Sequence, residues 1–342
     1  MTDRVISVIT PFYNSRDFMD VPYKSLLNQS YKNWEWICVD DCSTDETLKI
    51  LEEWASNDSR IKVVKTTVNG GNAAKSINYG IPYCSGSHIQ ILGHDDELTS
   101  DTLESISQRI AETNADVIIP DAEVVNDLVE NVKNYKIIGV KKHKEWIDSD
   151  EQRNVILTPK EACQYSIGWR LHTWACYSKE LWMRCGLDDE DGMNGDEYLT
   201  RVFLLNANKV AFSKGTYRYI RRPTSISNKL SVKFFDVFKT EEKLLKLVRE
   251  NHFDKNVIKI QVNSLVHKYY SCLIKFKLTY HNFSSDEKKQ IESMLMHGKV
   301  LLFRYVPVFK IFTSFFDKYL KSLFYYHIWY FLNNRLKRRG II

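Results

Sequence analysis

Two pairs of adjacent acids are the residues of this sequence whose type and spacing suggest chemistry. Asp95 and Asp96 form one pair, and Asp40 and Asp41 form another further back. Neighbouring carboxylates repel each other unless solvent or a cation separates them. Hard divalent ions such as Mn²⁺ or Mg²⁺ take oxygen ligands and are commonly shared between a carboxylate and substrate phosphates. The alternative is an acidic surface loop, with Asp40 beginning an Asx turn before a helix.

The elements that would position these acids alternate between strands and helices. Apolar runs predict strands at 5–10, 35–39, 61–65 and 88–92, and helical spacing predicts helices at 47–55 and 73–83. We expect Pro11 to stop the first strand. The alternation predicts a right-handed parallel α/β sheet, in which ligands bind beyond the carboxyl ends of strands. Both acidic pairs follow such ends.

Four stretches, in this order, resemble the N-terminal half of family 2 glycosyltransferases with the GT-A fold: VISVITPFYN, WICVDDCSTDETLKIL, NGGNAAKSINYGI and IQILGHDDEL. The resemblance implies an α/β fold with a Rossmann-like mixed, mainly parallel sheet flanked by helices, plus a C-terminal helical region. It divides the chain into a nucleotide-sugar-binding half at 1–105 and an acceptor-binding, catalytic half at 106–230. A helical, basic and aromatic region follows at 231–342.

The same resemblance implies roles in binding the donor. Pro11 and Tyr13 would lie against the nucleotide base, and Asp41 would bind the uracil ring. Lys75 and Asn78 would line the nucleotide pocket.

The second acidic pair would act on the ribose and the diphosphate. Asp95 would contact the ribose, and Asp96 would hold Mn²⁺ or Mg²⁺ on the diphosphate. Many family members carry a further aspartate where this chain has Gly93, so metal binding would rest on Asp96.

Residues 194–201 occupy the place of the family's Glu-Asp motif, whose aspartate deprotonates the acceptor hydroxyl. The order here is Asp then Glu, so Asp196 is the expected base and Glu197 the alternative. Both acids would otherwise cap the following helix, with Arg201 as a partner within it. Arg222 stands where the family often has a histidine and would neutralise the leaving diphosphate. A solvated basic loop is the alternative there.

Charge separates the C-terminal region from the rest. Residues 1–230 carry a net charge of −7 and residues 231–342 one of +12. From Lys299 onward, nine Lys or Arg alternate with thirteen aromatic residues, a pattern typical of an interfacial helix on an anionic membrane. The alternative is a helical cap on the catalytic domain. The longest uncharged run there, Ser322–Asn334, has 13 residues, against the ~20 that a spanning helix needs.

The resemblance implies an inverting, metal-dependent hexosyltransferase of bacterial polysaccharide biosynthesis. It would move a sugar from a UDP-sugar to a hydroxyl of a glycan acceptor, which we expect to be lipid-linked. The N-terminus lacks the features of a signal peptide, so we expect a cytoplasmic protein, peripheral on the cytoplasmic face of the inner membrane. No nucleic-acid motif is present, and a nucleic-acid partner is not expected. The alternatives are a nucleotidyltransferase and a catalytically silent scaffold that binds a sugar nucleotide or a membrane.

Overall fold

The fold is described from a computed structural model, which places residues 4–126, 136–141, 154–167, 171, 174–185, 195–221, 230–307 and 310–311. Contacts within the chain define two units. One joins residues 1–191 with 199–228, and the other joins residues 192–198 with 229–342. The functional boundaries at 105/106 and 230/231 stay predictions, and a single sheet runs through both of the first two ranges.

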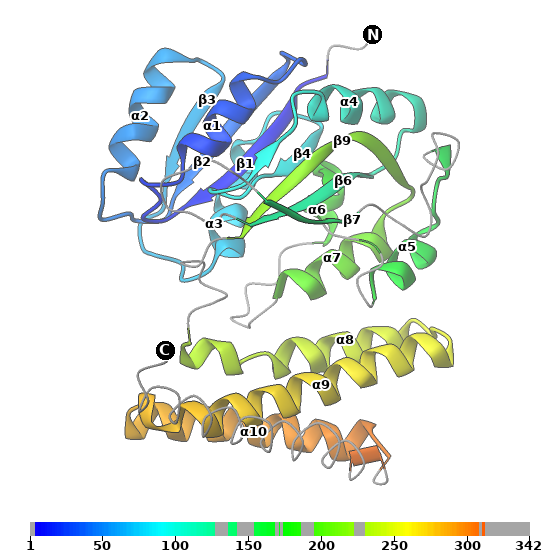
Figure 1. The fold of residues 1–342 in the computed structure, drawn as a ribbon. Coiled ribbons are helices and arrows are strands. Elements are labelled where there is room, and N and C mark those ends of the chain that lie inside the picture. The colour runs from blue at the N-terminus through cyan, green and yellow to red at the C-terminus, as the bar shows by residue number, and fades with distance from the viewer. Residues whose placement is uncertain are drawn as a thin grey trace. The chain divides into compact units, whose positions relative to one another are not determined.

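The first unit is built on one sheet of nine strands among the described residues (Figure 1). Its strands follow the order β3-β2-β1-β4-β8-β6-β9-β5, and β7 pairs with β6. The bounds are β1 Ile6–Phe12, β2 Trp34–Asp40, β3 Ile61–Lys65, β4 His88–Ile91, β5 Glu97–Leu98, β6 Val117–Asn126, β7 Lys136–Lys141, β8 Cys176–Ser178 and β9 Val210–Arg221. The first four strands are parallel to one another, and β8 pairs antiparallel with β4. The predicted α/β fold with a mixed sheet is confirmed.

Seven α-helices among the described residues up to 206 accompany the sheet. They are α1 Asp20–Leu27, α2 Thr47–Asn57, α3 Ala73–Gly80, α4 Thr102–Thr113, α5 Pro159–Ser166, α6 Lys179–Cys185 and α7 Gly195–Asn206. The strand order runs outward from β1 to β3 and then returns to β4 on the other side of β1. Right-handed crossovers therefore place α1 and α2 on one face and α3 on the opposite face.

Side chains on the two faces of β2 explain this packing. Trp36 stacks with Trp54 of α2 at 5.8 Å between ring centroids, and Trp54 stacks with Tyr23 of α1 at 4.0 Å. Val39 points to the opposite face, because successive residues of a strand alternate. There α3 approaches so closely that a Cβ on Gly80 would lie 2.6 Å from a Val39 methyl carbon. Glycine at this position therefore allows the helix to rest directly on the sheet.

The first strand is longer than the sequence predicts. Pro11 was expected to stop it, but β1 continues through Pro11 to Phe12, with Pro11 in register with Val39 of β2. Pairing with β4 on the other side ends at Ile9. Proline is tolerated there because the strand has only one neighbour at that position, so the missing N–H leaves no ladder bond unmade.

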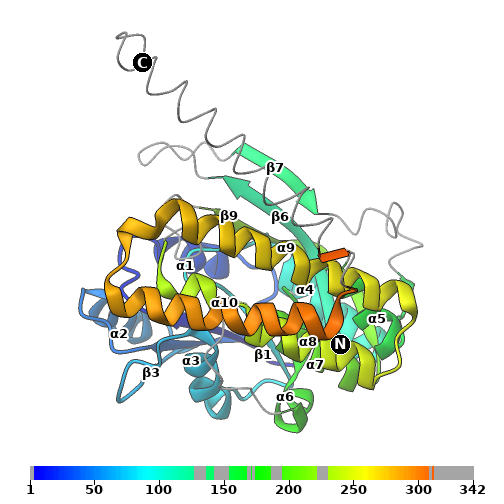
Figure 2. The same cartoon turned by 90° about the horizontal axis from the view of Figure 1, so that it is seen from below.

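The second unit contains three helices in its described part, α8 Phe238–Glu250, α9 Lys255–Thr279 and α10 Ser285–Tyr305. A 3₁₀ turn, Val232–Phe235, precedes α8 in the chain. Figures 1 and 2 show the three helices packed side by side. They enclose a separate apolar core that includes Phe235, Phe238, Leu265 and Ile291. The predicted C-terminal helical region is confirmed.

A buried carboxylate braces the amino-terminal end of the sheet. Glu35 of β2 is 5% exposed and accepts hydrogen bonds from Ser7 Oγ at 2.6 Å and Ser85 Oγ at 2.9 Å. Its other oxygen lies 2.7 Å from Lys62 Nζ. Burial alone would raise the pKa of Glu35, but these donors outweigh it and lower the pKa from 4.5 to about 2.

Replacing Glu35 with glutamine should lower the free energy of unfolding by about 2 kcal/mol at pH 7. The folded-state pKa, about 2, lies below the ordinary 4.5, so the charged form stabilises the fold above pH 4.5 and loses this effect as the pH falls toward 2. Urea unfolding of both proteins at several pH values should therefore show a difference that shrinks below pH 4.5. As a control, Asp20→Asn removes an exposed pair with Lys24 and should cost less than about 0.5 kcal/mol. A pH-independent difference would contradict the assignment.

Candidate active site

The carboxyl ends of three adjacent strands gather the predicted donor residues. Strand β1 lies between β2 and β4, and all three run in the same direction. Phe12 at the end of β1 is in register with Asp40 at the end of β2. The loops that follow these strands carry Tyr13, Asp41 and Asp95, so all three residues lie in loops at the same edge of the sheet.

Hydrogen bonds hold the loop after β1 against the loop after β2. Asn14 has a positive φ of 47°. Its side-chain oxygen accepts from the Thr44 amide at 2.8 Å, and its own amide donates to Ser43 Oγ at 3.1 Å. Arg16 and Glu46 form an ion pair at 2.9 Å across the same loops. The backbone next to Tyr13 is therefore fixed, while the Tyr13 side chain is 48% exposed.

The two acids after β2 have different tasks. Asp40 is fully buried, and its Oδ2 accepts from the Ser43 amide at 3.3 Å, as in the Asx turn. Asp41 is 5% exposed, and its Oδ1 accepts from Thr66 Oγ1 at 2.9 Å. The Gly70 amide donates to both Asp41 oxygens, at 2.9 and 3.0 Å. Asp41 is thereby oriented by β3 and by the turn that precedes α3.

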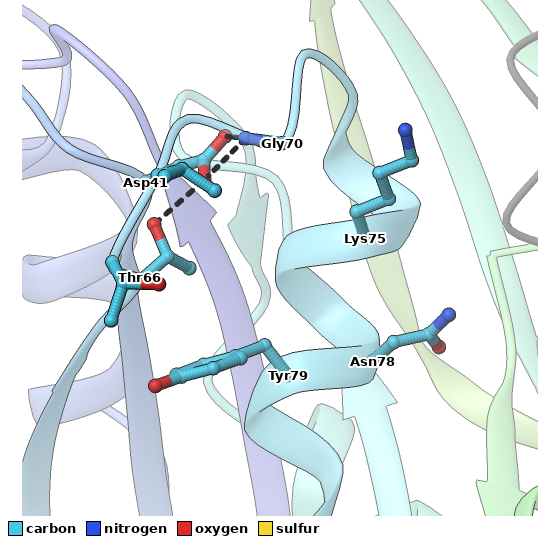
Figure 3. A pocket seen from close by; sticks show the side chains of 8 residues that line it. Asp41, Thr66, Gly70, Lys75, Asn78 and Tyr79 are labelled. Atoms are coloured by element: carbon cyan, nitrogen blue, oxygen red, sulfur yellow. Dashed lines mark hydrogen bonds between the residues drawn. The ribbon is translucent and has the colours of Figure 1, made fainter.

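Asp41 forms part of a pocket of about 440 Å³ (Figure 3). The lining residues are Asp41, Thr66, Thr67, Val68, Gly70, Lys75, Asn78 and Tyr79. Figure 3 shows Tyr79 on the side of α3 that faces Asp41 and Thr66, with Lys75 and Asn78 on the other side of the helix. The structure thus brings the predicted Asp41, Lys75 and Asn78 to one pocket. Pro11 and Tyr13 do not line it.

The first turn of α3 gives this pocket a positive end. Asn72 caps the helix, because its side-chain oxygen accepts from the Lys75 amide at 2.9 Å. The remaining amides of the first turn and the helix dipole favour negative charge at this end. Lys75, in the same turn, adds a full positive charge. A phosphate group suits this arrangement.

The two acids after β4 differ in exposure. Asp96 is 4% exposed; its Oδ2 accepts from the Tyr217 hydroxyl at 2.6 Å and its Oδ1 from the Ile220 amide at 2.9 Å. The same hydroxyl accepts from the Gly93 amide at 3.0 Å. Burial, and then the charge of Asp96, raise the pKa of Tyr217, so it remains a donor. Asp95 is only half-buried. Asp96 therefore ties its loop to β9, and Asp95 is the more accessible carboxylate.

Gly93 makes the Asp96 arrangement possible. A Cβ on Gly93 would lie 2.4 Å from Asp96 Oδ2, which is well inside contact distance. The aspartate that many family members carry at this position would therefore push Asp96 away from Tyr217. In this chain, Gly93, Asp96 and Tyr217 form a mutually dependent set.

The residues of this loop are compatible with a shared metal ion. No group of three or more Asp, Glu, His or Cys side chains among the described residues is placed to enclose one. A hard ion on a diphosphate needs only one or two carboxylates, since phosphates and water complete its shell. Asp95, half-buried at the edge of the sheet, meets that requirement. The prediction that Asp96 holds the ion is not tested by these contacts, and the greater exposure of Asp95 favours Asp95 as the alternative.

Aromatic rings support the strand to which Asp96 is tied. The Trp174 ring stacks on Tyr217 with centroids 5.5 Å apart, and on Tyr219 with centroids 5.2 Å apart. Arg218, between them in sequence, is paired with Glu97 and Glu123 at 2.8 Å each. Arg222 lies outside the described residues, so its proposed contact with the diphosphate stays a prediction.

The predicted catalytic acids lie in the first turn of α7. Asp196 is exposed, whereas Glu197 is 9% exposed and lies 3.5 Å from Lys268 Nζ of α9. Arg201 donates to the Ser166 carbonyl at 2.7 Å. Both acids suit the positive end of the helix. Asp196 is the more exposed of the two, and their catalytic roles stay predictions.

Several residues of this site were not found from the sequence. Tyr217, which donates to Asp96, is 121 positions away along the chain. Thr66 lies just before the NGGNAAKSINYGI stretch and Tyr79 lies within it, but neither was given a role from the sequence. Lys268 lies in a helix that contains four other lysines, so nothing in the sequence distinguishes it. Within the first unit, only the fold brings Thr66, Tyr79 and Tyr217 to the strand ends.

Comparison with known proteins places this architecture in a class. Residues 7–169 match the model of glycosyl transferase family 2, so this part of the chain is similar to the domain of that family. It is 43% identical over 100 residues to TuaG of Bacillus subtilis, a putative teichuronic acid biosynthesis glycosyltransferase, covering 29% of this chain and 39% of TuaG. It is 28% identical over 225 residues to the glycosyltransferase GlyG of Streptococcus pneumoniae, covering 65% of this chain and 72% of GlyG.

Solved structures of S. aureus TarS, residues 1–349, have a similar fold. The complex with UDP-GlcNAc has a TM-score of 0.61 and 20% identity, over 84% of this chain and 79% of that chain. Another TarS structure has a TM-score of 0.59 and 21% identity, over 86% and 79%. Together with the strand order, this likeness establishes the GT-A fold.

Replacing Gly93 with alanine tests the mutual dependence of Gly93, Asp96 and Tyr217. The added methyl group should displace Asp96 from its two donors and lower the free energy of unfolding by about 1–3 kcal/mol. Gly195→Ala is the control, because a Cβ there meets nothing within 4 Å, and alanine favours a helix. Urea denaturation measures both. Equal stability of the Gly93→Ala protein and the wild type would show that Asp96 does not depend on this space.

Proposed function

We propose that this chain transfers a sugar from a UDP-sugar to a hydroxyl of a glycan acceptor, with inversion at the anomeric carbon, in polysaccharide biosynthesis. The observation that carries the proposal is the pocket at the strand ends, in which Thr66 and Gly70 hold the Asp41 carboxylate in place. The fold shared with TarS, which has been solved with UDP-GlcNAc, supports the choice of donor. A 34% identical stretch of 128 residues in WfgD of Escherichia coli, named as a UDP-Glc glucosyltransferase, supports it too.

The uracil ring would lie beside Asp41. A carboxylate oxygen accepts from the N3–H of uracil, and Thr66 and Gly70 leave one Asp41 oxygen with a single donor. Tyr79 and Val68, 41% and 73% exposed, offer apolar surface to the ring. Pro11 and Tyr13 would cover the base from β1. Lys75 and Asn78 would contact the diphosphate of the donor.

The Asp95-Asp96 loop would serve the ribose and the diphosphate. Both oxygens of Asp96 already accept from β9, so we assign the contact with Mn²⁺ or Mg²⁺ to Asp95, with Asp96 fixing the loop. A divalent ion there would offset charge on the leaving diphosphate. Calorimetric titration of UDP with and without Mn²⁺ separates the two roles. Asp95→Asn should remove the effect of the metal, and Asp96→Asn should mainly lower stability.

Asp196 would act as the base of the transfer reaction. It takes the proton of the acceptor hydroxyl as that oxygen forms a bond to the anomeric carbon from the face opposite the leaving UDP. The bond from the anomeric carbon to the diphosphate oxygen breaks, and the oxygen keeps the electron pair. Glu197 is less suited to this task, because it is buried beside Lys268.

Replacing Asp196 with asparagine should lower turnover by ~10²–10⁴-fold and leave UDP affinity largely unchanged. UDP release from UDP-GlcNAc or UDP-glucose with a synthetic lipid-linked acceptor measures turnover, and calorimetry measures affinity. Asp286→Asn is the matched control, since Asp286 is also an exposed acid in the first turn of a helix. Normal turnover of the Asp196→Asn protein would contradict the assigned role. A wild type that binds UDP but never releases it from a donor would favour the silent scaffold.

The acceptor would be carried by a lipid, and the C-terminal unit would meet the membrane surface. No helix in the described ranges has the length and apolar character to cross a bilayer. Instead, α10 exposes Met296, Val300 and Phe303 to 58%, 47% and 59%. Their spacing places them on one helix face, and Lys299 and Arg304 lie next to them. Apolar side chains flanked by cations fit the headgroup region of an anionic membrane. This would hold the protein on the cytoplasmic face of the inner membrane.

Replacing Met296, Val300 and Phe303 with serine should reduce binding to vesicles that contain phosphatidylglycerol, because each loses apolar area that would enter the lipid. Co-sedimentation with the vesicles measures the bound fraction of each protein. The control is Val155→Ser with Ile156→Ser, which are 43% and 44% exposed in the other unit. Deletion from residue 298 onward is a poorer test, since it would cut α10 in the middle. Equal binding of the triple variant would rule out this face as the contact.

A further inference from the structure

Within the second unit, a cluster of charged side chains links residues 195–198, the first turn of α7, to α8 and α9. Lys268 Nζ of α9 lies 2.6 Å from Glu241 Oε1 of α8 and 3.5 Å from Glu197 Oε2 of α7. Gln261 and Ser264 donate to the Glu241 carboxylate at 3.0 and 3.2 Å. Residues 192–198 accordingly belong to the same unit as 229–342.

The cluster is strongly shielded from solvent. Glu241 is 0% exposed and Glu197 is 9% exposed. Burial raises the pKa of Glu241. Burial by itself would lower the pKa of Lys268, but the charges of Glu241 and Glu197 outweigh it and raise that pKa. Lys268, with 21% of its side chain exposed, is therefore a half-buried cation shared between two carboxylates.

Such a cluster contributes little net stability. Removing charges from water costs several kcal/mol for each ion, and apolar residues of similar size often do as well or better. The helices α8, α9 and α10 already have an apolar core. The observed geometry indicates instead that the cluster orients the first turn of α7, because Glu197 of that turn is one of the two carboxylates beside Lys268. Tyr198, the next residue, lies under Lys243 of α8 at 5.5 Å from its ring centroid.

We propose that Lys268 is a positioning residue for the transfer reaction: through Glu197 it fixes the first turn of α7, whose backbone also carries Asp196. The assignment rests on the proposed function, in which Asp196 takes the acceptor proton. Lys268 touches neither donor nor acceptor in this role. Glu241 holds Lys268 in place, and Gln261 and Ser264 hold Glu241.

Lys268→Met tests the role but leaves Glu241 buried without its cation, which can unfold the protein. Lys268→Met combined with Glu241→Gln removes the closer ion pair, leaves only Glu197 charged in the cluster, and should recover most of the lost stability. The double variant should still lose at least ~10-fold in kcat, since a displacement of about 1 Å can cost ~10²-fold. KM for the UDP-sugar and the Kd for UDP should stay within about twofold, because the donor pocket is untouched. Lys268→Arg, which keeps the charge, should recover part of the kcat.

The control is Lys246→Met, which removes an exposed partner of Glu242 on α8 and should leave kcat unchanged. A stable double variant with wild-type kcat would overturn the proposal and assign the cluster to stability alone. Amide hydrogen exchange gives a readout that does not depend on activity. Residues 199–202 donate to the carbonyls of the first turn, so their exchange should accelerate in the stable double variant, and unchanged exchange would also overturn the proposal. A wild type without transfer activity would overturn the proposed function instead.

Discussion

The shared edge at which β1, β2 and β4 end is the constraint on which the rest of the site depends. Parallel strands bring their following loops to one place, and acids in those loops must be hydrogen-bonded or hydrated. Asp41 meets this demand through Thr66 and Gly70, and Asp96 through Tyr217 and Ile220. The bonds that satisfy these carboxylates also fix the loops that carry them.

In two pairs of neighbouring acids, the two members differ in burial in the same way. In Asp95-Asp96 and in Asp196-Glu197, the second acid is buried and bonded to a distant element, while the first is more exposed. The buried member holds the backbone in position. We propose that the exposed member meets the ligand, the metal-bound diphosphate in one case and the acceptor hydroxyl in the other. This accounts for two carboxylates where one would suffice for the chemistry.

The sequence predicts what short-range patterns determine. The strands and helices from β1 to β4 follow from apolar periodicity and turn residues, and motif order implies the GT-A fold. Pro11 was misjudged because the missing neighbour of β1 at that position is a property of the sheet. Tyr217 and Lys268 could not be found, since their partners Asp96 and Glu197 are 121 and 71 positions away. Contacts of that kind depend on the complete fold.

The proposal that the Asp41 pocket reads the base of UDP is tested most directly by comparing UDP with CDP. Uracil has an N–H at position 3 that can donate a hydrogen bond to the Asp41 carboxylate, whereas N3 of cytosine is itself an acceptor. Calorimetry should show that the wild type prefers UDP by at least ~10-fold, since a site built for a donor rejects the analogue that lacks it. In Asp41→Asn, which offers an N–H of its own, the preference should vanish or reverse. Equal affinity of the wild type for the two nucleotides, or an undiminished preference in the variant, would contradict this account.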